Sequence, residues 1–502
     1  MYPSYLISML WFGYIYYLFF VLVMIILVSF VFRLTLINST NSQTSFRSLL
    51  FYLLIILNFV VLLSTIALYN IFHNYSSILV SYSLRKNEVF YYANLLKPSS
   101  SYLHFCDLHY ASVYYFPFTY IFILITFVSL YYCLSYNVNE LSTFSIFCLI
   151  IMLSGYVLFY TDSLILFFVS YEALLLPSFF ILYKFAKTRR SVEAAYLMFF
   201  WTQFGAMFLI FGLLYLFFVT GCSSFYQISL TSLNKSEVNF IFLTLLIGFG
   251  VKLPLWPFYG WLPKAHVEAS TNFSIFLSGV LVKFAFFGFL KILLVIQLDP
   301  TFYFIYPFLT IGICDSVFKL FYQTDLKKLV AYSTVVEMHW LTICIVSGHS
   351  SLMLAGFSML ISHALLSTNS FLLVDAIGRR FKTRLITEIG GVNFLCPKLF
   401  YVSLLNLLIF LGFPGTIMFI SEILFFSFFF DLHPTLYFIY LFLLYLLGPT
   451  VFFRSWLIAL FGNSTYLSKT IPADLNSREI LIFSALISLM TWLGISWQSL
   501  LF

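Results

Sequence analysis

Charged residues are scarce in this chain: Asp, Glu, Lys and Arg make up 9% of its 502 residues, whereas hydrophobic residues make up 62%. Soluble domains carry about 25% charged residues, so this composition excludes an ordinary soluble protein. A membrane span needs about 20 apolar residues, and the chain is long enough for many of them. We therefore predict a protein that crosses a membrane repeatedly.

Signatures of bound metals and nucleotides are also missing from the sequence. Its seven cysteines are scattered and include no CxxC pair, which argues against zinc and iron–sulfur sites. No glycine-rich nucleotide-binding motif is present either. We expect no cofactor on this chain and no nucleic-acid partner. The first apolar run, Met9 to Phe32, lacks a basic preceding region and a cleavage site, so we expect it to be a span.

The apolar runs predict an all-α protein with about fourteen transmembrane helices, with boundary errors of a few residues. The predicted spans are 9–32, 48–70, 117–135, 142–160, 163–185, 196–219, 239–262, 272–296, 302–322, 328–348, 351–376, 398–429, 436–459 and 479–500.

This pattern predicts four regions along the chain. Residues 1–116 hold two helices and a long polar loop, and residues 117–296 hold spans three to eight. Residues 302–459 hold spans nine to thirteen, and residues 460–502 hold the last helix.

The loops on the two sides of the predicted membrane differ in basic residues. If the spans alternate in direction, seventeen of the 25 Lys and Arg residues fall on one side and four on the other. Loops on the cytoplasmic or matrix side carry such an excess. We therefore expect the basic loops on that side and both termini on the opposite side.

Four charged residues lie deep inside predicted spans: Glu172, Lys252, Lys283 and Glu422. A charge at the centre of a bilayer costs about 2.5–3.5 kcal/mol on a lenient scale, so such residues usually mark an ion path or a proton relay. Simpler interpretations exist. Glu172 and Lys252 can form a structural ion pair. Lys283 can extend its amine to the membrane surface, and Glu422 can stay neutral.

Two of these charges stand beside helix-breaking residues. The segment VKLPLWP places two prolines just after Lys252, and the segment GFPGT places Pro414 and Gly415 before Glu422. Proline removes a backbone donor, and freed polar groups at membrane depth are tolerated only inside protein or beside a wet cavity. Two broken spans therefore indicate a repeated transporter architecture with ion sites at the breaks.

Several segments resemble the antiporter-like membrane subunits of respiratory complex I, which are related to subunits of cation/proton antiporters. The resemblance covers about residues 115–460 and rests on VKLPLWPFYGWLPKAHVEAS (251–270), QTDLKKLVAYSTVVEM (323–338), GFPGTIMFISE (412–422), SYEALLLP (170–177) and ISHALLS (361–367).

The resemblance implies roles for five residues along a polar axis in the middle of the membrane. Glu172 matches the glutamate of span five, and Lys252 matches the lysine of span seven that pairs with it. Lys283 and His363 match the lysine of span eight and the histidine of span eleven. Glu422 matches the glutamate of span twelve. The resemblance also implies that spans 4–8 and 9–13 are two inverted five-helix repeats.

The sequence departs from the family pattern at two positions. Tyr259 and Glu337 stand where similar members commonly carry histidines, and His339 cannot take the second place because it faces another direction on a helix. Glu337 can itself relay protons or pair with Lys283.

Other polar residues have two interpretations each. His363 can handle protons or be a hydrogen-bonded packing residue. His266 and Glu268 can form the mouth of a half-channel or a capping cluster. Asp315 and Lys319, four residues apart, are expected to be a self-neutralising pair on one helix face.

These observations predict a proton-translocating subunit of NADH:ubiquinone oxidoreductase in the mitochondrial inner membrane. By resemblance, NADH, FMN, iron–sulfur clusters and ubiquinone belong to other subunits. The expected partners are sister antiporter-like chains and membrane lipids. Burial favours a neutral lysine and a nearby carboxylate favours the charged form, so motion between Glu172 and Lys252 would load or unload a proton.

Two other functions remain open. The first is a subunit of a multi-subunit Na+/H+ antiporter, in which the same residues exchange sodium for protons. The second is a structural membrane subunit with an inactive channel. This interpretation rests on Tyr259 and Glu337, which stand where histidines are expected.

Overall fold

The computed structural model describes residues 118–130, 138–186, 188–296, 305–462 and 473–496. The predicted region 1–116, with the first two predicted spans, lies outside them. In the described ranges the regular elements are helices, and two isolated bridges, Ser163 with Ser224 and Asp325 with Leu385, connect loops. The all-α prediction is therefore confirmed for this part of the chain.

The first half of the described chain is built from long apolar helices, several of which are interrupted. Its helices are Phe118–Leu130, α5 (Val138–Tyr160), α6 (Leu164–Ala173), α7 (Leu175–Lys184), α8 (Arg189–Thr220), α9 (Phe225–Ser229), α10 (Lys235–Lys252), η2 (Phe258–Gly260), α11 (Trp261–Glu268), α12 (Thr271–Phe276), η3 (Leu277–Leu281) and α13 (Val282–Ile296).

The second half repeats this kind of construction. Its helices are α14 (Ile305–Phe321), α15 (Leu326–Val346), α16 (Ser350–Phe381), α17 (Val392–Leu395), α18 (Pro397–Phe410), α19 (Ile417–Leu432), α20 (Pro434–Tyr440), η4 (Leu441–Leu447), α21 (Gly448–Phe461) and α22 (Ser477–Ile495).

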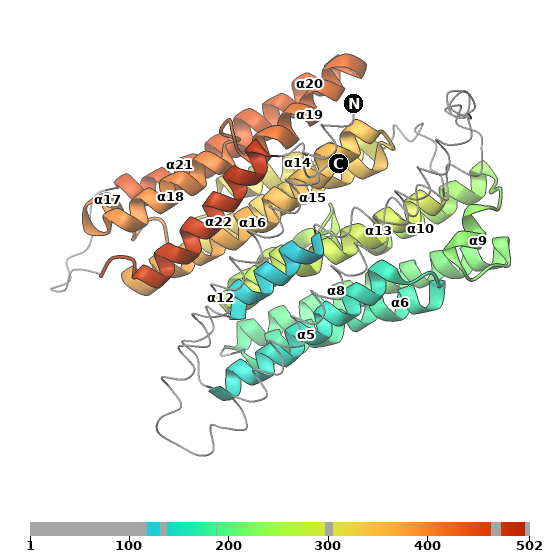
Figure 1. The fold of residues 1–502 in the computed structure, drawn as a ribbon, viewed down its shortest axis with the longest axis horizontal. Coiled ribbons are helices and arrows are strands. Elements are labelled where there is room, and N and C mark those ends of the chain that lie inside the picture. The colour runs from blue at the N-terminus through green and yellow to red at the C-terminus, as the bar shows by residue number, and fades with distance from the viewer. Residues whose placement is uncertain (1–117, 131–137, 187, 297–304, 463–472, 497–502) are drawn as a thin grey trace, which may run out of the picture.

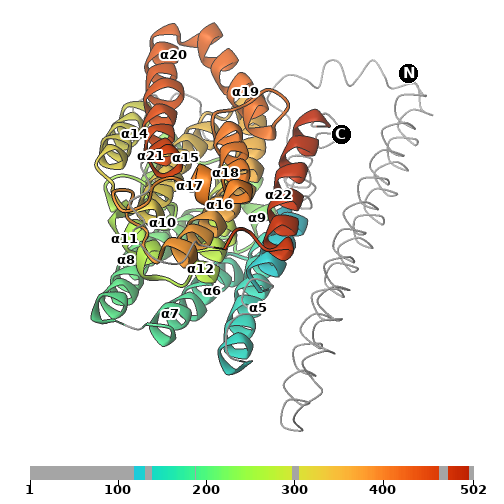
Figure 2. The ribbon, with the colours of Figure 1, turned by 90° about the vertical axis from the view of Figure 1, so that its left-hand side faces the viewer.

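The long helices run side by side as roughly parallel rods. Figure 1 shows α5, α6 and α8 on one side of the molecule, α18 to α22 on the other, and α10 with α12 to α16 between them. Figure 2 shows α22 at the edge of the bundle, where it packs against α16, α18 and α19.

Burial separates central helices from peripheral ones. In the most apolar stretch, 94% of residues are buried in α12–α13 and in α15, and 89% in α16, against 39% in α8 and 33% in α22. Since lipid and protein interiors are equally apolar, an outer helix stays apolar even where it is exposed. The central helices are therefore the place where a polar side chain is shielded from lipid.

Eight helices among the described residues are long and apolar enough to cross a membrane. Each predicted span from the third to the fourteenth falls on a helix or on a pair of helices. Spans seven and twelve are not among the eight because they are broken: α10 ends at Lys252 and α18 ends at Phe410. The total of fourteen spans stays a prediction.

The two predicted breaks are present, and the structure adds two π-helical segments. The chain leaves α10 and resumes a helix in η2 and α11, and it leaves α18 and resumes in α19. The π-helical segments η3 and η4 lie a few residues after the starts of α12 and α20. Each half thus holds a helix broken next to a proline, followed by a helix with a π segment, and π segments frequently mark functional sites. The first half has a further interruption at Leu174, between α6 and α7.

Small residues bring α8 and α10 together next to the first break. A Cβ added to Gly248 of α10 would lie 2.8 Å from Leu209 Cβ, and one added to Gly205 of α8 would lie 2.9 Å from the Gly248 carbonyl oxygen. Glycines at a helix interface permit this close backbone approach inside a membrane. The contact places the end of α10 beside the polar residues of α8.

Candidate functional site

The structure buries most of the residues that the sequence singles out. Six of them are at most 6% exposed: Lys252, His266, Lys283, Glu337, His363 and Glu422. Glu172 is partly exposed. None of the six faces lipid, which a purely snorkelling or surface role would require.

Glu172 and Lys252 approach the same junction but do not form an ion pair in the described structure. Lys252 Nζ donates to the Tyr171 carbonyl oxygen at 2.9 Å and lies 3.7 Å from the centroid of the Tyr171 ring. The Glu172 carboxylate instead accepts a hydrogen bond from Gln203 Nε2 of α8, at 2.9 Å. The two charges are therefore neighbours with separate partners, and the pair implied by the family resemblance is open in this conformation.

Lys283 owes its position to the π segment η3. Its ammonium donates to the carbonyl oxygen of Ser278, which lies within η3. A π-helical turn frees a backbone carbonyl that an α-helical turn would use. Lys283 is fully buried without a described carboxylate partner.

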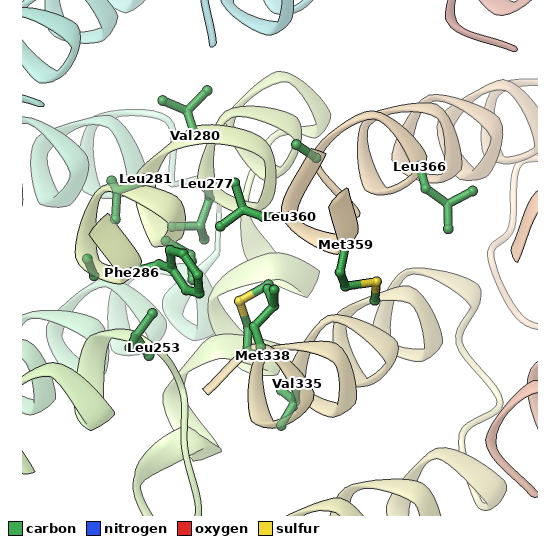
Figure 3. Close-up of a cluster of buried hydrophobic side chains, with 14 of the residues drawn as sticks. Leu253, Leu277, Val280, Leu281, Phe286, Val335, Met338, Met359, Leu360 and Leu366 are labelled. Carbon is green, nitrogen blue, oxygen red and sulfur yellow. The ribbon is translucent and has the colours of Figure 1, made fainter. Parts of the chain in front are cut away.

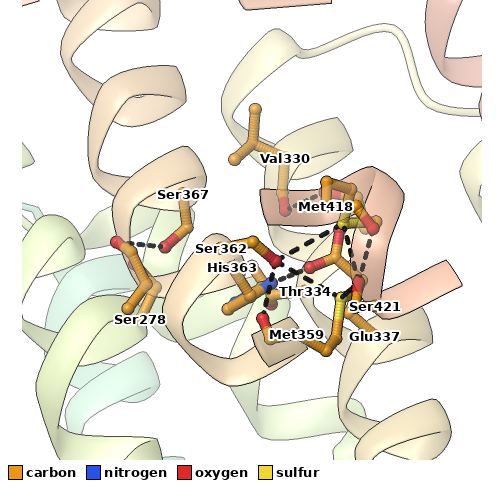
Figure 4. A network of polar contacts seen from close by, with 12 residues as sticks. Ser278, Val330, Thr334, Glu337, Met359, Ser362, His363, Ser367, Met418 and Ser421 are labelled. Atoms are coloured by element: carbon orange, nitrogen blue, oxygen red, sulfur yellow. Dashed lines mark hydrogen bonds and ion pairs between the residues drawn. The ribbon is translucent and has the colours of Figure 1, made fainter. Parts of the chain in front are cut away.

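Glu337 and His363 meet between α15 and α16, as Figure 4 shows. His363 Nδ1 is in hydrogen-bonding contact with Glu337 Oε2, and both side chains are buried. Of the two interpretations of Glu337, its own participation is compatible with this geometry, whereas pairing with Lys283 is not observed. The other ring nitrogen of His363, Nε2, has no described partner.

His339 faces away from this pair, as the helical spacing predicts. Its Nε2 accepts the backbone N–H of Trp256 at 2.8 Å, in the first break, and its Nδ1 contacts the Val335 carbonyl oxygen at 2.8 Å. Because both ring nitrogens are used, His339 holds the broken segment in place rather than carrying protons.

Serine and methionine side chains connect α16 with α19 beside the pair. Ser362 Oγ lies 3.5 Å from Met418 Sδ, and Ser421 Oγ lies 3.7 Å from Met359 Sδ (Figure 4). The next residue, Glu422, turns its carboxylate toward the second break. A Cβ on Gly412 would lie 2.1 Å from Glu422 Oε2, so only glycine leaves room for that carboxylate.

His266 is fully buried, and neither of its ring nitrogens has a described partner. Its ring is stacked on Phe371 of α16, with centroids 4.8 Å apart. Glu268 points elsewhere and accepts from Thr188 Oγ1 at 3.4 Å. His266 and Glu268 therefore do not form one cluster. Buried polar atoms are nearly always hydrogen-bonded, so the nitrogens of His266 and His363 Nε2 are places for water.

Apolar side chains stand close to several of these polar groups in the sequence. Leu253 follows Lys252, Leu281 lies two residues before Lys283 and Met338 follows Glu337, and Figure 3 shows these three in one buried cluster together with Leu277 and Phe286. The described hydrogen bonds do not connect Lys252, Lys283 and Glu337 with one another. A proton path between them therefore needs water.

Two further lysines hold helix ends: Lys291, whose place near the end of its predicted span favours extension of the amine to the membrane surface, and Lys327, which the sequence does not single out. Lys291 donates to the Phe159 carbonyl oxygen at 2.9 Å and to that of Thr161, at the end of α5, and it is buried rather than directed to a membrane surface. Lys327 donates to the Ala269 carbonyl oxygen at 2.5 Å, at the end of α11. Cations stabilise the carbonyl ends of helices.

Gln203 was also missed, although a Thr-Gln pair inside an apolar span is a visible signal. Its contact with Glu172 shows that the site includes α8. In the described part of the chain, no group of three His, Cys, Asp or Glu residues has a geometry that could hold a metal ion.

Comparisons with known proteins identify the family. The family model for the transmembrane region of NADH:quinone oxidoreductase and Mrp antiporters matches residues 161–448. The chain belongs to this family. The match covers both breaks and all seven predicted site residues, and the family resemblance seen in the sequence motifs is confirmed.

Several proteins with similar sequences are named as chains or subunits of NADH oxidoreductases. NADH-ubiquinone oxidoreductase chain 4 of Paramecium tetraurelia is 37% identical over 325 residues, covering 64% of this chain and 68% of the relative. The protein of the same name from Marchantia polymorpha is 32% identical, covering 66% and 68%. NADH-quinone oxidoreductase subunit M of Rickettsia felis is 30% identical, covering 68% and 70%.

Solved structures confirm the antiporter-like membrane fold. The Mrp complex of a Dietzia species contains a chain with a TM-score of 0.67 and 16% identity, covering 76% of this chain and 81% of that one. Respiratory complex I from Thermus thermophilus with bound NADH contains a chain with a TM-score of 0.66 and 19% identity, covering 76% and 82%.

Proposed function

We propose that this chain translocates protons as an antiporter-like membrane subunit of NADH:ubiquinone oxidoreductase. The observation that carries the proposal is the burial of Lys252 and Lys283 beside helix interruptions, where each donates to a backbone carbonyl and neither has a carboxylate of the described residues within ion-pair distance. The sequence relatives bear the name of that enzyme. Oxidation of NADH would take place on other subunits.

The proposed path runs through Glu172, Lys252, Lys283, His363 and Glu422, with Glu337 and His266 as additional members. A stable structure gains little from a lone buried charge, so the placement of several such groups in the central helices supports a functional role. The place of Lys252 at the first break and of Glu422 at the second supports the same conclusion, since ion sites of transporters lie at interrupted helices.

The separation of Glu172 from Lys252 at the first break suggests how Lys252 takes up and releases a proton. Lys252 donates to the Tyr171 carbonyl oxygen while Glu172 is held by Gln203. If Glu172 turns from Gln203 toward Lys252, the carboxylate favours the ammonium form, and when it turns back the lysine can release a proton. Gln203 then acts as the alternative partner that keeps the carboxylate satisfied.

Water completes the path between the pairs. The nitrogens of His266 and the Nε2 of His363, which have no described partner, provide donors and acceptors for water. Leu253, Leu281 and Met338 of the buried apolar cluster are near neighbours in the sequence of Lys252, Lys283 and Glu337. Hydrophobic constrictions close a path by expelling water, so this cluster would act as the gate that prevents leakage.

The two halves of the chain are proposed to be inverted repeats. Spans four to eight include the break after α10 and the π segment η3, and spans nine to thirteen include the break after α18 and η4. The same order of interruptions in both halves supports a repeat. We also propose fourteen spans in the mitochondrial inner membrane, with the basic loops in the matrix and both termini in the intermembrane space.

Exchange of sodium for protons is the second candidate. The Mrp complex of the Dietzia species supports it, because its chain has a similar fold. Sodium-dependent proton uptake into vesicles without NADH would decide for this function. The partners proposed for the chain are sister antiporter-like subunits and lipids of the membrane arm.

The test is the variant Lys252→Met in the full chain within the assembled complex, reconstituted into vesicles. We expect NADH-driven proton pumping to be lost while the complex still assembles. Lys264→Met is the matched control, because Lys264 is an exposed lysine of the neighbouring helix α11. Undiminished pumping by Lys252→Met would refute the proposal, and a chain that only supports structure would give that result.

A further inference from the structure

The Asp315–Lys319 pair is more than the self-neutralising pair that its spacing predicts. The two residues lie four apart on α14, with Lys319 Nζ at 2.8 Å from Asp315 Oδ2. The side chains are 31% and 47% exposed, so the pair lies at the edge of the described structure. An isolated pair of this kind contributes little to stability.

A third residue from another element closes the group. The Tyr259 hydroxyl, from η2 in the first break, hydrogen-bonds to Asp315 Oδ2 and lies 2.5 Å from Lys319 Nζ. Lys319 Nζ also lies 4.8 Å from the centroid of the Tyr259 ring. Tyr259 is itself buried, so its ring extends from the interior to a charged pair at the edge.

The same broken segment is held from a second direction. His339 of α15 accepts the backbone N–H of Trp256, and its ring centroid lies 6.4 Å from that of Tyr259. Gly312 of α14 makes this possible, because a Cβ there would lie 2.2 Å from His339 Nε2 and 2.9 Å from Trp256 Cβ. The chain between α10 and α11 is thus fixed to α14 and α15 at two points, Trp256 and Tyr259.

The hydroxyl of Tyr259 points away from the buried charges. Its described partners are Asp315 and Lys319 on α14, and no described hydrogen bond connects it with Lys252 or His339. Tyr259 therefore cannot carry protons from the interior by direct contact. What it does is hold the segment that begins directly after Lys252, since α10 ends at that residue.

We propose that Tyr259, Asp315 and Lys319 are positioning residues for proton translocation, which fix the broken segment on α14 and thereby set where Lys252 stands relative to Tyr171 and Glu172. This inference rests on the proposed function. Charge-assisted hydrogen bonds are strong enough to tether the segment in this way.

The experiment compares full-chain variants in the assembled complex, reconstituted into vesicles, over a range of pH. Tyr259→Phe removes only the hydroxyl, and we expect the pumping rate to fall about tenfold, the effect of losing one hydrogen bond to a charged group. We also expect the pH of half-maximal pumping to shift, because Lys252 changes its surroundings. NADH oxidation by the detergent-solubilised complex should stay unchanged.

Further variants separate positioning from a general loss of structure. Lys319→Met should resemble Tyr259→Phe, whereas Lys319→Arg keeps the charge and the donors and should retain pumping. The double variant Tyr259→Phe/Asp315→Asn should be no worse than the single variants if the residues form one tether. Tyr322→Phe, at an exposed tyrosine just after α14, is the control and should change nothing.

The outcomes distinguish this inference from the proposed function. If Lys252→Met abolishes pumping while Tyr259→Phe leaves both the rate and the pH profile unchanged, the tether is refuted and the proposed function stands. If Lys252→Met pumps normally, the proposed function fails first. If Tyr259→Phe prevents assembly, the pumping rates of Lys319→Arg and Lys319→Met are compared instead. A higher rate for Lys319→Arg supports the inference, and equal rates overturn it.

Discussion

Glu337 and His363 join α15 to α16 through a direct contact between the glutamate carboxylate and the histidine Nδ1. Both helices are among the most buried of the described chain, so the pair lies in the centre of the bundle. An acid and a base that share one hydrogen bond can pass a proton with little rearrangement.

Glu337→Gln should keep the shape of the site and remove its charge. We expect pumping to fall at least tenfold, because a charged hydrogen-bond partner of His363 is replaced by a neutral one. The measurement is NADH-driven acidification of vesicles that contain the assembled complex. The control Glu193→Gln changes an exposed glutamate of α8 and should have no effect. Normal pumping by Glu337→Gln would remove this pair from the path.

Gly412→Ala should disturb the second break more than a positive φ alone can explain. Gly412 has a φ of 66° and faces Glu422, whereas Gly221 has a φ of 65° and open space around it. Left-handed backbone costs about 1–2 kcal/mol for a residue with a Cβ. Gly221→Ala should show only that cost in thermal stability, and Gly412→Ala should add a loss of pumping. Equal effects of the two variants would contradict a role for the Glu422 contact.

Gly312→Ala should force α14 away from the first break. The added methyl would meet His339 Nε2 at 2.2 Å, and such overpacking costs about 1–3 kcal/mol. We expect a lower melting temperature of the assembled complex and slower pumping. Gly260→Ala, in η2 with no atom within 4 Å, is the matched control. A Gly312→Ala variant as stable as Gly260→Ala would show that this close approach does not exist in solution.

Lys291→Met should loosen the end of α5 from α13. The substitution leaves the carbonyl oxygens of Phe159 and Thr161 without their buried donor, at a cost of about 1–3 kcal/mol. We expect a lower melting temperature with pumping retained, since Lys291 lies off the proposed path. Lys291→Arg should be less harmful because it keeps charged donors. A loss of pumping without a loss of stability would instead assign Lys291 to the path.

Cys396 should react slowly with alkylating reagents. Burial raises the pKa of its thiol, and the nearby Asp474 raises that pKa further. A raised pKa leaves less thiolate at neutral pH, and its labelling should increase only as the pH is raised above the usual cysteine range. Cys222, which is partly exposed, should be labelled before Cys396. Mass spectrometry of chains alkylated stepwise measures the order, and earlier labelling of Cys396 would contradict its burial.

The helices and both breaks could be predicted because their signals are local. Apolar length and the prolines after Lys252 and around position 414 are read directly from neighbouring residues. The buried charges were visible for the same reason, since a charge in an apolar run needs no partner to be noticed.

Partners could not be predicted, because they depend on how each helix is rotated against its neighbours. The sequence does not tell that Lys252 turns to the Tyr171 carbonyl while Glu172 turns to Gln203. It also does not tell that Tyr259 meets Asp315, which lies 56 residues away. The π segments have no comparable sequence signal, so the carbonyl partner of Lys283 was unforeseeable.

The π segment η3 has one more consequence for Lys283. A π-helical turn contains one residue more than an α-helical turn, and this extra residue can move into the next turn without unwinding the helix. Such a slip would rotate Lys283 by about 100° around the helix axis. The amine would then contact a different set of neighbouring residues, while both ends of the helix stay in place.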